Sequence, residues 1–514
     1  MNGAESLVRT AAAAGIEFCF ANAGTTELAL VAALDAAPGV RGVLGLFEGV
    51  CTGAADGYAR MTGRPAMTLL HLGPGFANGI ANLHNARRAH SPLVNVIGDH
   101  ATWHAGADAP LASDISSLAG PVSGWVRTNR SASEVADDLA DAVAAAVTPP
   151  GQVATLIVPS DCQWDEAPGP ARPRPAAARA KASGEAVEAA ARALRDTPAS
   201  RMLIGGPALD ARGLRAAARI AAATECRVFH ETFSARLERG GDLPDLTRLP
   251  YFPEQAHAAL AGADVLVLAG ARDPVAFFAT PGVPSRLAPE NCECLELAGP
   301  GDDAAEALES LANALGAAPF AADGSAQRPE APDAGPLDPG TLGRALAALQ
   351  PENAVVMDEG ATSGFAYYTL APTAPRHSWL MLTGGAIGQG LPCAMGAALA
   401  CPDRRVIALQ ADGSGLYTLQ ALWSMAREGL DVTVVVCANR SYRILQLELG
   451  RAGIAEPGPQ AQNLVDLSRP VMDWVALARG FGVPAAAAED AASFSRELAR
   501  ALATPGPSLI EARL

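Results

Sequence analysis

Short apolar runs that end in glycine-containing loops recur along the whole chain. They cover residues 65–70, 92–98, 200–206, 263–270, 353–358, 405–410 and 431–439. Runs of this kind are typical of strands buried on both faces, and the helix-compatible stretches between them indicate parallel sheets covered by helices. The pattern predicts an α/β fold of doubly wound parallel-sheet domains. Ligand-binding residues are then expected just past the carboxyl ends of the strands.

Two stretches rich in Pro and Ala, 165–186 and 321–340, interrupt this pattern. Segments of such composition bury too little apolar surface to fold alone, and they commonly join domains. They divide the 514 residues into 1–165, 187–320 and 341–514, each within the usual size of a domain. We therefore expect three doubly wound domains.

Charge and composition exclude some classes of partner. The net charge of −16, without a basic stripe, argues against binding of nucleic acid or anionic membranes. No run of about 18 apolar residues predicts a transmembrane helix, and the first residues do not read as a secretion signal. The nine scattered cysteines suggest reduced thiols, so a cytoplasmic protein is expected.

Two polar residues occupy equivalent positions after successive predicted strands. Asp412 follows 405–410, and Asn439 ends the run 431–439, with one helical stretch between them. A strand–helix–strand unit brings such ends side by side. Carboxylate, amide and main-chain oxygens suit Mg²⁺, and Gly413 lets the backbone approach a phosphate closely. Asp-Gly alone is also ordinary turn chemistry, so the pairing with Asn439 carries the prediction.

These residues resemble the signature of thiamine diphosphate-dependent enzymes, a Gly-Asp-Gly at one strand end and an Asn-Asn at the next. The chain departs from it at Ala411 and Ala438 and keeps Asp412 and Asn439. The resemblance implies thiamine diphosphate and Mg²⁺, with Asp412, Asn439 and the main-chain oxygen of Ser441 as metal ligands. It also implies cofactor contacts from neighbouring loop residues, namely Gly413, Ser414 and Tyr442.

Two further segments of the third part resemble cofactor-binding stretches of this family. In residues 381–392, Met-Leu-Thr-Gly-Gly-Ala-Ile-Gly-Gln-Gly-Leu-Pro, the resemblance implies that Ile387 wedges between the two rings of a bent cofactor. The alternative is a glycine-rich turn that leads into a buried helix. Residues 358–363 are similar to a stretch that contacts the cofactor, which implies a cofactor contact from Thr362.

Glu48 stands in an otherwise apolar stretch of the first part. A lone buried carboxylate is costly unless it has a partner, and the alternative is a side chain that reaches solvent. The following Ala-Asp-Gly-Tyr-Ala-Arg, residues 55–60, resembles the family's pyrimidine-domain motif. The resemblance implies that Glu48 hydrogen-bonds the aminopyrimidine and promotes removal of the thiazolium C2 proton. Asp56 and Arg60 are expected to support the helix.

His71 is the predicted acid/base residue. Residues 71–78 resemble the Gly-Pro-Gly-x-x-Asn turn of acetolactate synthases, which implies a cofactor contact from Asn78, whereas a histidine at this strand end resembles benzoylformate decarboxylase. Imidazole exchanges protons near neutral pH, although a structural histidine is the alternative. The second active-site histidine of that decarboxylase would fall near Phe278 or Ala279 and is absent.

The loop 22–27 matches a family loop that faces the reactive end of the cofactor. Thr25 is expected to contact substrate, or else Thr25 or Thr26 caps a helix. His100 and His104 follow the run 92–98 and are candidates for the substrate pocket, a role that the sequence leaves open.

The resemblance spans nearly the whole chain, in the order pyrimidine, central and diphosphate domain, and implies an enzyme acting on a 2-oxo acid. Three alternatives stay open: an acetolactate synthase-like carboligase, which we favour, a benzoylformate decarboxylase-type enzyme, and an inactive homologue with a binding or regulatory role. The resemblance also implies a homodimer or homotetramer with active sites between subunits. FAD is not expected, because the central part has no convincing flavin-binding feature.

Overall fold

The computed structural model describes residues 1–322 and 327–514, so part of the predicted linker 321–340 lies outside the described residues. The described chain forms three sheets with a parallel core, and the predicted α/β class is confirmed. It divides into two compact units. The first contains Met1–Ala176, Arg328–Ala371 and Leu382–Leu514, and the second contains Ala177–Gln327 and Pro372–Met381.

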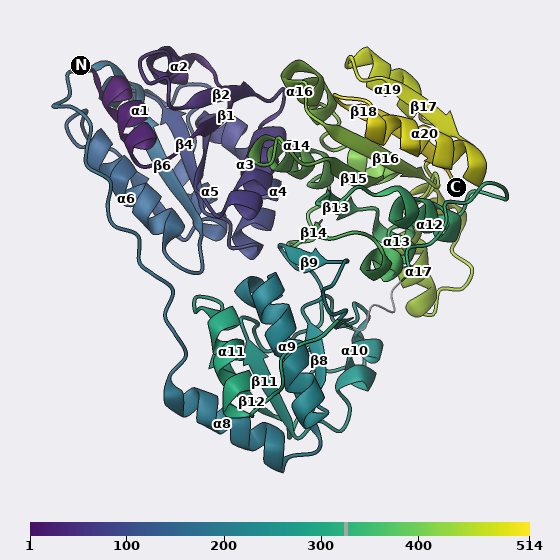
Figure 1. Ribbon diagram of the computed structural model, residues 1–514. Helices are drawn as coiled ribbons and strands as arrows, with labels where there is room; N and C mark the ends of the chain where they lie inside the picture. Colours follow the sequence, from purple (N-terminus) through teal and green to yellow (C-terminus); the bar gives the residue numbers. More distant parts are fainter. Residues whose placement is uncertain (323–326) are drawn as a thin grey trace. The chain divides into compact units, whose positions relative to one another are not determined.

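The N-terminal sheet has the strand order β2-β1-β3-β4-β6-β5, and all its pairs are parallel. Helices α1, α2 and α6 bury apolar side chains against one face, and α3, α4 and α5 lie on the other (Figure 1). The elements are β1 (Phe18–Asn22), β2 (Arg41–Leu44), β3 (Ala66–His71), β4 (Leu93–Asp99), β5 (Trp125–Thr128), β6 (Val153–Pro159), α1 (Gly3–Ala13), α2 (Leu28–Leu34), α3 (Glu48–Thr62), α4 (Leu72–Arg88), α5 (Ile115–Ala119), α6 (Val135–Val147) and α7 (Ser160–Trp164).

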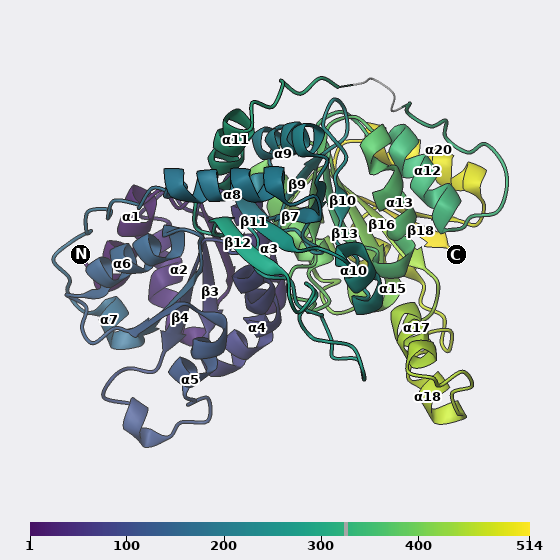
Figure 2. The same cartoon turned by 90° about the horizontal axis from the view of Figure 1, so that it is seen from below.

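The C-terminal part of the same unit contains five parallel strands in the order β17-β18-β16-β15-β13. Helices α17 and α18 extend beyond the sheet (Figure 2). The elements are β13 (Val355–Glu359), β15 (Val406–Ala411), β16 (Val432–Ala438), β17 (Ala485–Ala488), β18 (Ser508–Arg513), α12 (Pro339–Leu349), α13 (Phe365–Leu370), α14 (Gly390–Ala400), α15 (Asp412–Gly415), α16 (Ala421–Glu428), α17 (Arg443–Arg451), α18 (Pro459–Asn463), α19 (Trp474–Gly480) and α20 (Ala491–Ala503).

The second unit contains a parallel sheet of order β10-β8-β7-β11-β12. It also holds a short antiparallel pair, β9 with β14, which the sequence did not predict. The elements are β7 (Ser200–Ile204), β8 (Arg227–His230), β9 (Leu237–Arg239), β10 (Thr247–Arg248), β11 (Val265–Ala269), β12 (Glu293–Ala298), β14 (His377–Met381), α8 (Gly184–Asp196), α9 (Ala211–Thr224), α10 (Pro253–Leu260) and α11 (Ala304–Ala314).

Helices α3 and α14 of the first unit pack closely because glycines line their contact. A Cβ added to Gly57 would lie 2.0 Å from the Cys393 carbonyl oxygen, and one added to Gly396 would lie 1.8 Å from that of Ala54. Any larger residue at these two positions would push the helices apart. The helix that begins at Glu48 is thereby held against the helix that comes after Ile387.

Among the helices of the described residues, none combines the length and the apolar character that crossing a membrane would require.

Candidate active site

Glu48 is the first residue of α3, and its side chain is buried, with 8% of the residue exposed. The side-chain amide of Asn78 on α4 donates a hydrogen bond to Glu48 Oε2 at 2.9 Å. Gly75 leaves room for the other oxygen, because a Cβ there would lie 3.0 Å from Oε1. The lone carboxylate of the apolar stretch is therefore buried with a partner, and Asn78 lies next to it.

His71 ends β3 and pairs with a glutamate that the sequence analysis missed. Its Nδ1 lies 2.8 Å from Glu27 Oε2 and 3.1 Å from Thr26 Oγ1. The Glu27 side chain is fully buried, whereas that of His71 is 22% exposed. The carboxylate also accepts the Gly24 amide at 2.7 Å, so it acts as an acceptor. This arrangement favours a proton on Nδ1, so Nε2 is the nitrogen that could exchange a proton with a ligand.

Thr25 is exposed at this same edge, at the start of a short 3₁₀ turn, Thr25–Glu27. The expected alternative that Thr25 or Thr26 caps a helix is wrong. The turn has Gly24 at its N-cap, and α2 has Glu27 there. The Thr26 hydroxyl instead donates a hydrogen bond to the Glu27 carboxylate. Neither threonine therefore caps a helix.

His100 and His104 lie past the end of β4, the strand next to His71. Gly98 is the register partner of His71, and His100 comes two residues later. The His100 and His104 rings are 5.4 Å apart, and the His104 ring is 5.7 Å from that of Trp103, which is 75% exposed. The two histidines therefore belong to the sheet edge that carries His71.

The predicted metal ligands lie at the carboxyl ends of β15 and β16. Asp412 is 1% exposed, and its oxygens accept the amides of Gly413 at 2.8 Å and Arg440 at 2.6 Å. Burial raises the pKa of this carboxyl, and the two amides oppose the shift. Asn439 Oδ1 accepts the Ser441 amide at 3.0 Å. The two loops are thus joined directly, as the parallel register of β15 and β16 requires.

The donor set at these loops fits Mg²⁺. No group of three or more His, Cys, Asp and Glu side chains is placed to hold a metal in residues 1–322 and 327–514, so a cation here would need amide and main-chain oxygens. The Asp412 carboxylate, the Asn439 amide and the Ser441 carbonyl could supply such oxygens, and Mg²⁺ commonly completes its shell with phosphate oxygens. In addition, the Ser441 hydroxyl is buried without a hydrogen-bond partner in the described structure.

The remaining predicted residues of these loops shape the backbone. A Cβ on Gly413 would lie 2.5 Å from the Tyr442 ring, so only glycine fits there. Ser414 Oγ accepts a hydrogen bond from the Gln410 side chain at 2.6 Å.

A cavity of about 440 Å³ opens beside Ser441 and extends along α17. Its other lining residues are Gln446, Leu449, Gly450, Ile454, Ala455, Pro457, Gln462, Val465 and Asp466.

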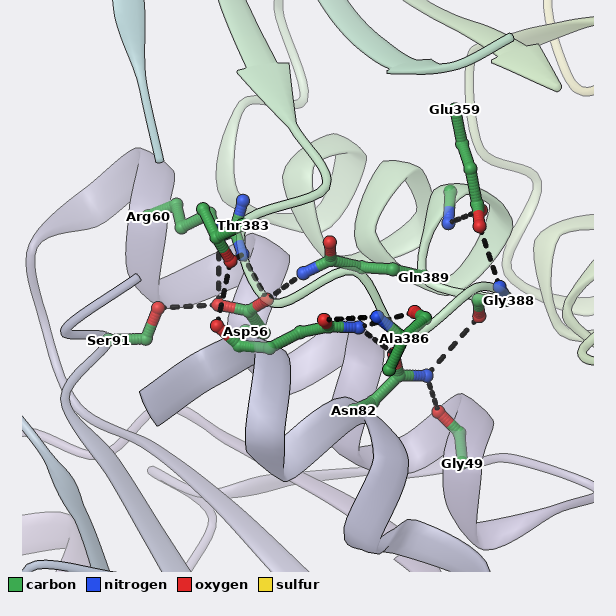
Figure 3. A network of polar contacts seen from close by, with 12 residues as sticks. Gly49, Asp56, Arg60, Asn82, Ser91, Glu359, Thr383, Ala386, Gly388 and Gln389 are labelled. Atoms are coloured by element: carbon green, nitrogen blue, oxygen red, sulfur yellow. Dashed lines mark hydrogen bonds and ion pairs between the residues drawn. The ribbon is translucent and has the colours of Figure 1, made fainter. Parts of the chain in front are cut away.

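Residues 383–390, which contain the half-buried Ile387, are fixed by side chains of the N-terminal sheet's helices (Figure 3). Asp56 accepts hydrogen bonds from Arg60 at 2.7 and 2.8 Å, from Ser91 at 2.5 Å and from Gln389 at 2.5 Å. Arg60 in turn donates to the Thr383 hydroxyl at 2.8 Å. Asp56 and Arg60 were expected to support the helix, and they also hold both ends of this segment.

Two asparagines of α4, also missed by the sequence analysis, hold the middle of the segment. Asn85 donates to the Ala386 carbonyl at 2.8 Å and accepts the Ala386 amide at 3.2 Å. Asn82 donates to the carbonyls of Gly49 at 2.8 Å and Gly388 at 3.3 Å. The spacing of three residues on one helix face could have suggested a shared partner for both.

Thr362 is half-buried in a 3₁₀ turn, Ala361–Ser363, just past the end of β13. It therefore lies on the same sheet edge as Asp412 and Asn439, because β13 and β15 are parallel neighbours.

Three sheets with a parallel core carry a buried acid after one strand end and carboxylate, amide and main-chain oxygens after two others, an arrangement typical of cofactor-dependent α/β enzymes. The comparisons with known proteins give the family. Residues 1–118 match the thiamine pyrophosphate enzyme N-terminal TPP-binding domain, and residues 358–512 match its C-terminal TPP-binding domain. The chain belongs to the thiamine pyrophosphate (thiamine diphosphate) enzyme family, as the resemblance had implied.

Individual relatives cover the whole chain. The Mycobacterium tuberculosis protein named "Putative acetolactate synthase large subunit IlvX" is 51% identical over 99% of this chain and 98% of its own. Benzoylformate decarboxylase of Pseudomonas aeruginosa is 31% identical over 97% of this chain and 96% of its own. The structure of a 4-hydroxybenzoylformate decarboxylase from Rhodococcus jostii superimposes with a TM-score of 0.87 at 26% identity, covering 100% of this chain and 99% of that one.

The buried Asp56–Arg60 pair generates a stability prediction. Asp56→Asn removes the negative charge that compensates the Arg60 guanidinium, whose side chain is 1% exposed. We expect the free energy of unfolding to fall by about 3–5 kcal/mol. The matched control is Asp242→Asn, because the side chains of Asp242 and its partner Arg215 are 58% and 37% exposed. Here the free energy of unfolding should fall by less than about 1 kcal/mol. Urea unfolding followed by circular dichroism measures both. Equal midpoints for the two variants would contradict the prediction.

Proposed function

We propose that the protein is a thiamine diphosphate- and Mg²⁺-dependent decarboxylase of 2-oxo acids, in which His71 supplies the proton that completes the product aldehyde. The observation that carries this proposal is the 2.8 Å contact between His71 and the buried Glu27. A histidine oriented by a buried carboxylate is suited to proton transfer near neutral pH. The names of the 31% identical relative and of the Rhodococcus jostii structure also support it.

When bound, the cofactor would supply a nucleophilic carbon and an electron sink for decarboxylation of a 2-oxo acid. Glu48 is proposed to hold a proton at N1′ of the aminopyrimidine, with Asn78 orienting its carboxylate. Asp412, Asn439 and the Ser441 carbonyl are proposed to hold Mg²⁺. The diphosphate would contact the loop residues Gly413, Ser414 and Tyr442, the rings would contact Ile387 and Thr362, and Thr25 would meet the substrate.

The same proposal assigns the pyrimidine to a domain of residues 1–165 and the diphosphate to a domain of residues 341–514, with a central domain, 187–320, between them. It includes a homodimer or homotetramer in which Glu48 of one subunit and Asp412 of another form one active site. Support comes from the resemblance stated above and from the separate positions of these residues, at the edges of two different sheets.

The carboligase that the sequence favoured becomes the second candidate, and it is supported by the 51% identical relative, which is named for acetolactate synthase. The two reactions share every step through loss of CO₂ and differ in the fate of the remaining carbon. A decarboxylase protonates that carbon, whereas a carboligase joins it to a second 2-oxo acid. His71 is better placed to serve the first outcome.

Product analysis tests the choice between these reactions. The protein is incubated with thiamine diphosphate, Mg²⁺ and a panel of aromatic and aliphatic 2-oxo acids, and we expect CO₂ and an aldehyde. His71→Asn should slow aldehyde release by about 10²–10⁴-fold, since it removes the proton donor. His257→Asn, in the second unit, is the matched control and should leave the rate unchanged, because the one hydrogen bond of this ring among the described residues goes to the Pro284 carbonyl.

A hydroxyketone longer than the substrate would instead favour the carboligase. If no acid in the panel yields either product, the result would favour an inactive homologue and would contradict the proposal.

Subunit mixing tests the shared active site. Glu48→Gln and Asp412→Ala should each abolish activity, because each removes a different half of the site. In a randomly mixed dimer population, half of the dimers contain one of each chain, and one of their two sites is intact, so about a quarter of wild-type activity should return. Each variant is unfolded and refolded alone as the control. No recovery after mixing would mean that one chain supplies the whole site.

A further inference from the structure

Two backbone amides on either side of Gln389 donate to a single buried carboxylate. Glu359, the last residue of β13, accepts the Gly388 amide on Oε1 at 2.6 Å and the Gly390 amide on Oε2 at 2.5 Å (Figure 3). The Gln410 side chain also donates to Oε2, at 3.3 Å. Glu359 is only 4% exposed, and none of the roles proposed above uses it.

The backbone around Gly388 is therefore held from two directions. The Gly388 amide donates to Glu359, and the Gly388 carbonyl accepts hydrogen bonds from Thr418 Oγ1 at 2.8 Å and from Asn82 at 3.3 Å. Gly388 has φ of +93°, a conformation that L-residues rarely adopt, so its shape depends on these contacts and on glycine itself. Gly390 has no room for a side chain, because a Cβ would lie 2.7 Å from Glu359 Oε2.

The residues between the held positions are left open. The amide and carbonyl of Ala386 both bond to Asn85, and those of Gly388 are engaged as described. No hydrogen bond in the described part of the chain uses the backbone groups of Gly385 or Ile387. Alternate residues of the segment are thus fixed by protein, and those between them remain available to a ligand.

We propose that Glu359 is a positioning residue, whose ionised carboxylate fixes Gly388 and Gly390 and so presents Ile387 and its neighbours to the cofactor. The proposal rests on the assignment of Ile387 to the cofactor under the proposed function. It adds Glu359 as a residue that fixes the backbone of residues 383–390 without being assigned a contact with the cofactor.

Only a carboxylate satisfies both amides at once. A glutamine in the same place would accept one amide and turn its own NH₂ group toward the other, and a protonated acid would do the same with its hydroxyl. Hydrogen bonds to an ionised acceptor are stronger than those to a neutral one, whereas two donors that face each other repel. The isosteric change to glutamine therefore loosens one of the two glycines with no change in volume.

Burial raises the pKa of Glu359 to about 7, and the amides of Gly390 and Gly388 and the Gln410 side chain partly oppose the shift. Among the described residues, the Cys393 thiol on α14 is the titratable group that also faces Glu359. The ionised form of Glu359 predominates above pH 7, so the segment should be held above pH 7 and loosened below it. Because the folded pKa exceeds the usual value, this group's contribution to stability is lost as pH rises through 7. The charge on Glu359 therefore fixes the segment but lowers the free energy of unfolding.

Hydrogen exchange and calorimetry on the apoprotein test the proposal. In Glu359→Gln at pH 8, we expect faster amide exchange in a peptide covering residues 383–391 and at least about 10-fold weaker binding of thiamine diphosphate with Mg²⁺, the loss of one charge-assisted bond. The matched control is Glu231→Gln in the second unit. Glu231 is half-buried, and desolvation likewise raises its pKa to about 7, but among the described residues its carboxylate accepts the Gly206 amide alone, at 3.1 Å. The control should change neither readout.

The pH dependence of the wild type provides a readout that needs no variant. Exchange in the same peptide should quicken as pH falls from 8 to 6, after correction for intrinsic rates, and this change should be absent in Glu359→Gln. Unchanged exchange and affinity in Glu359→Gln would overturn the proposal, as would a lower melting temperature with unchanged affinity. If no variant and no wild-type sample binds thiamine diphosphate, the proposed function fails, while the exchange data still report on Glu359.

Discussion

Two buried carboxylates, Asp56 and Glu359, hold residues 383–390 from opposite sides, and the position of Ile387 depends on them. Asp56 takes the Gln389 side chain, and Glu359 takes the amides of Gly388 and Gly390. An ionised carboxylate is the side chain that accepts several N–H groups at once, which explains why charge is buried here in spite of its desolvation cost. The glycine contacts between α3 and α14 make this arrangement sterically possible.

The chemistry proposed for the protein is divided between carboxylates in different surroundings. Glu48 has one side-chain donor, Asn78, whereas Glu27 is fully buried against His71 and Gly24. Asp412 receives two main-chain amides in a loop that offers further oxygen ligands. Each environment suits a different task, namely proton exchange with a ring, orientation of an imidazole and coordination of a cation.

The parts that the sequence predicted are those encoded locally. A buried parallel strand followed by a polar residue is visible within ten residues, so the sheets and the positions of Asp412 and Asn439 at strand ends were predictable. The contact of His71 with Glu27 was not, because it joins residues 44 apart through the pairing of β1 with β3. The stretch 358–363 was singled out, but the role of Glu359 in it was not predicted, since its partners are backbone amides, which leave no pattern in side-chain chemistry. The three-residue strand β9 is too short to carry a periodicity.

We propose that the loops after β15 and β16 bind the cofactor's diphosphate through a metal ion. A crystal structure of the protein grown with thiamine diphosphate and Mg²⁺ tests this binding mode. We expect an ion about 2.1 Å from an Asp412 carboxylate oxygen and from the Asn439 amide oxygen, with diphosphate oxygens completing its shell. Ordered cofactor elsewhere in the molecule, or a diphosphate at these loops with no metal between it and Asp412, would rule this binding mode out.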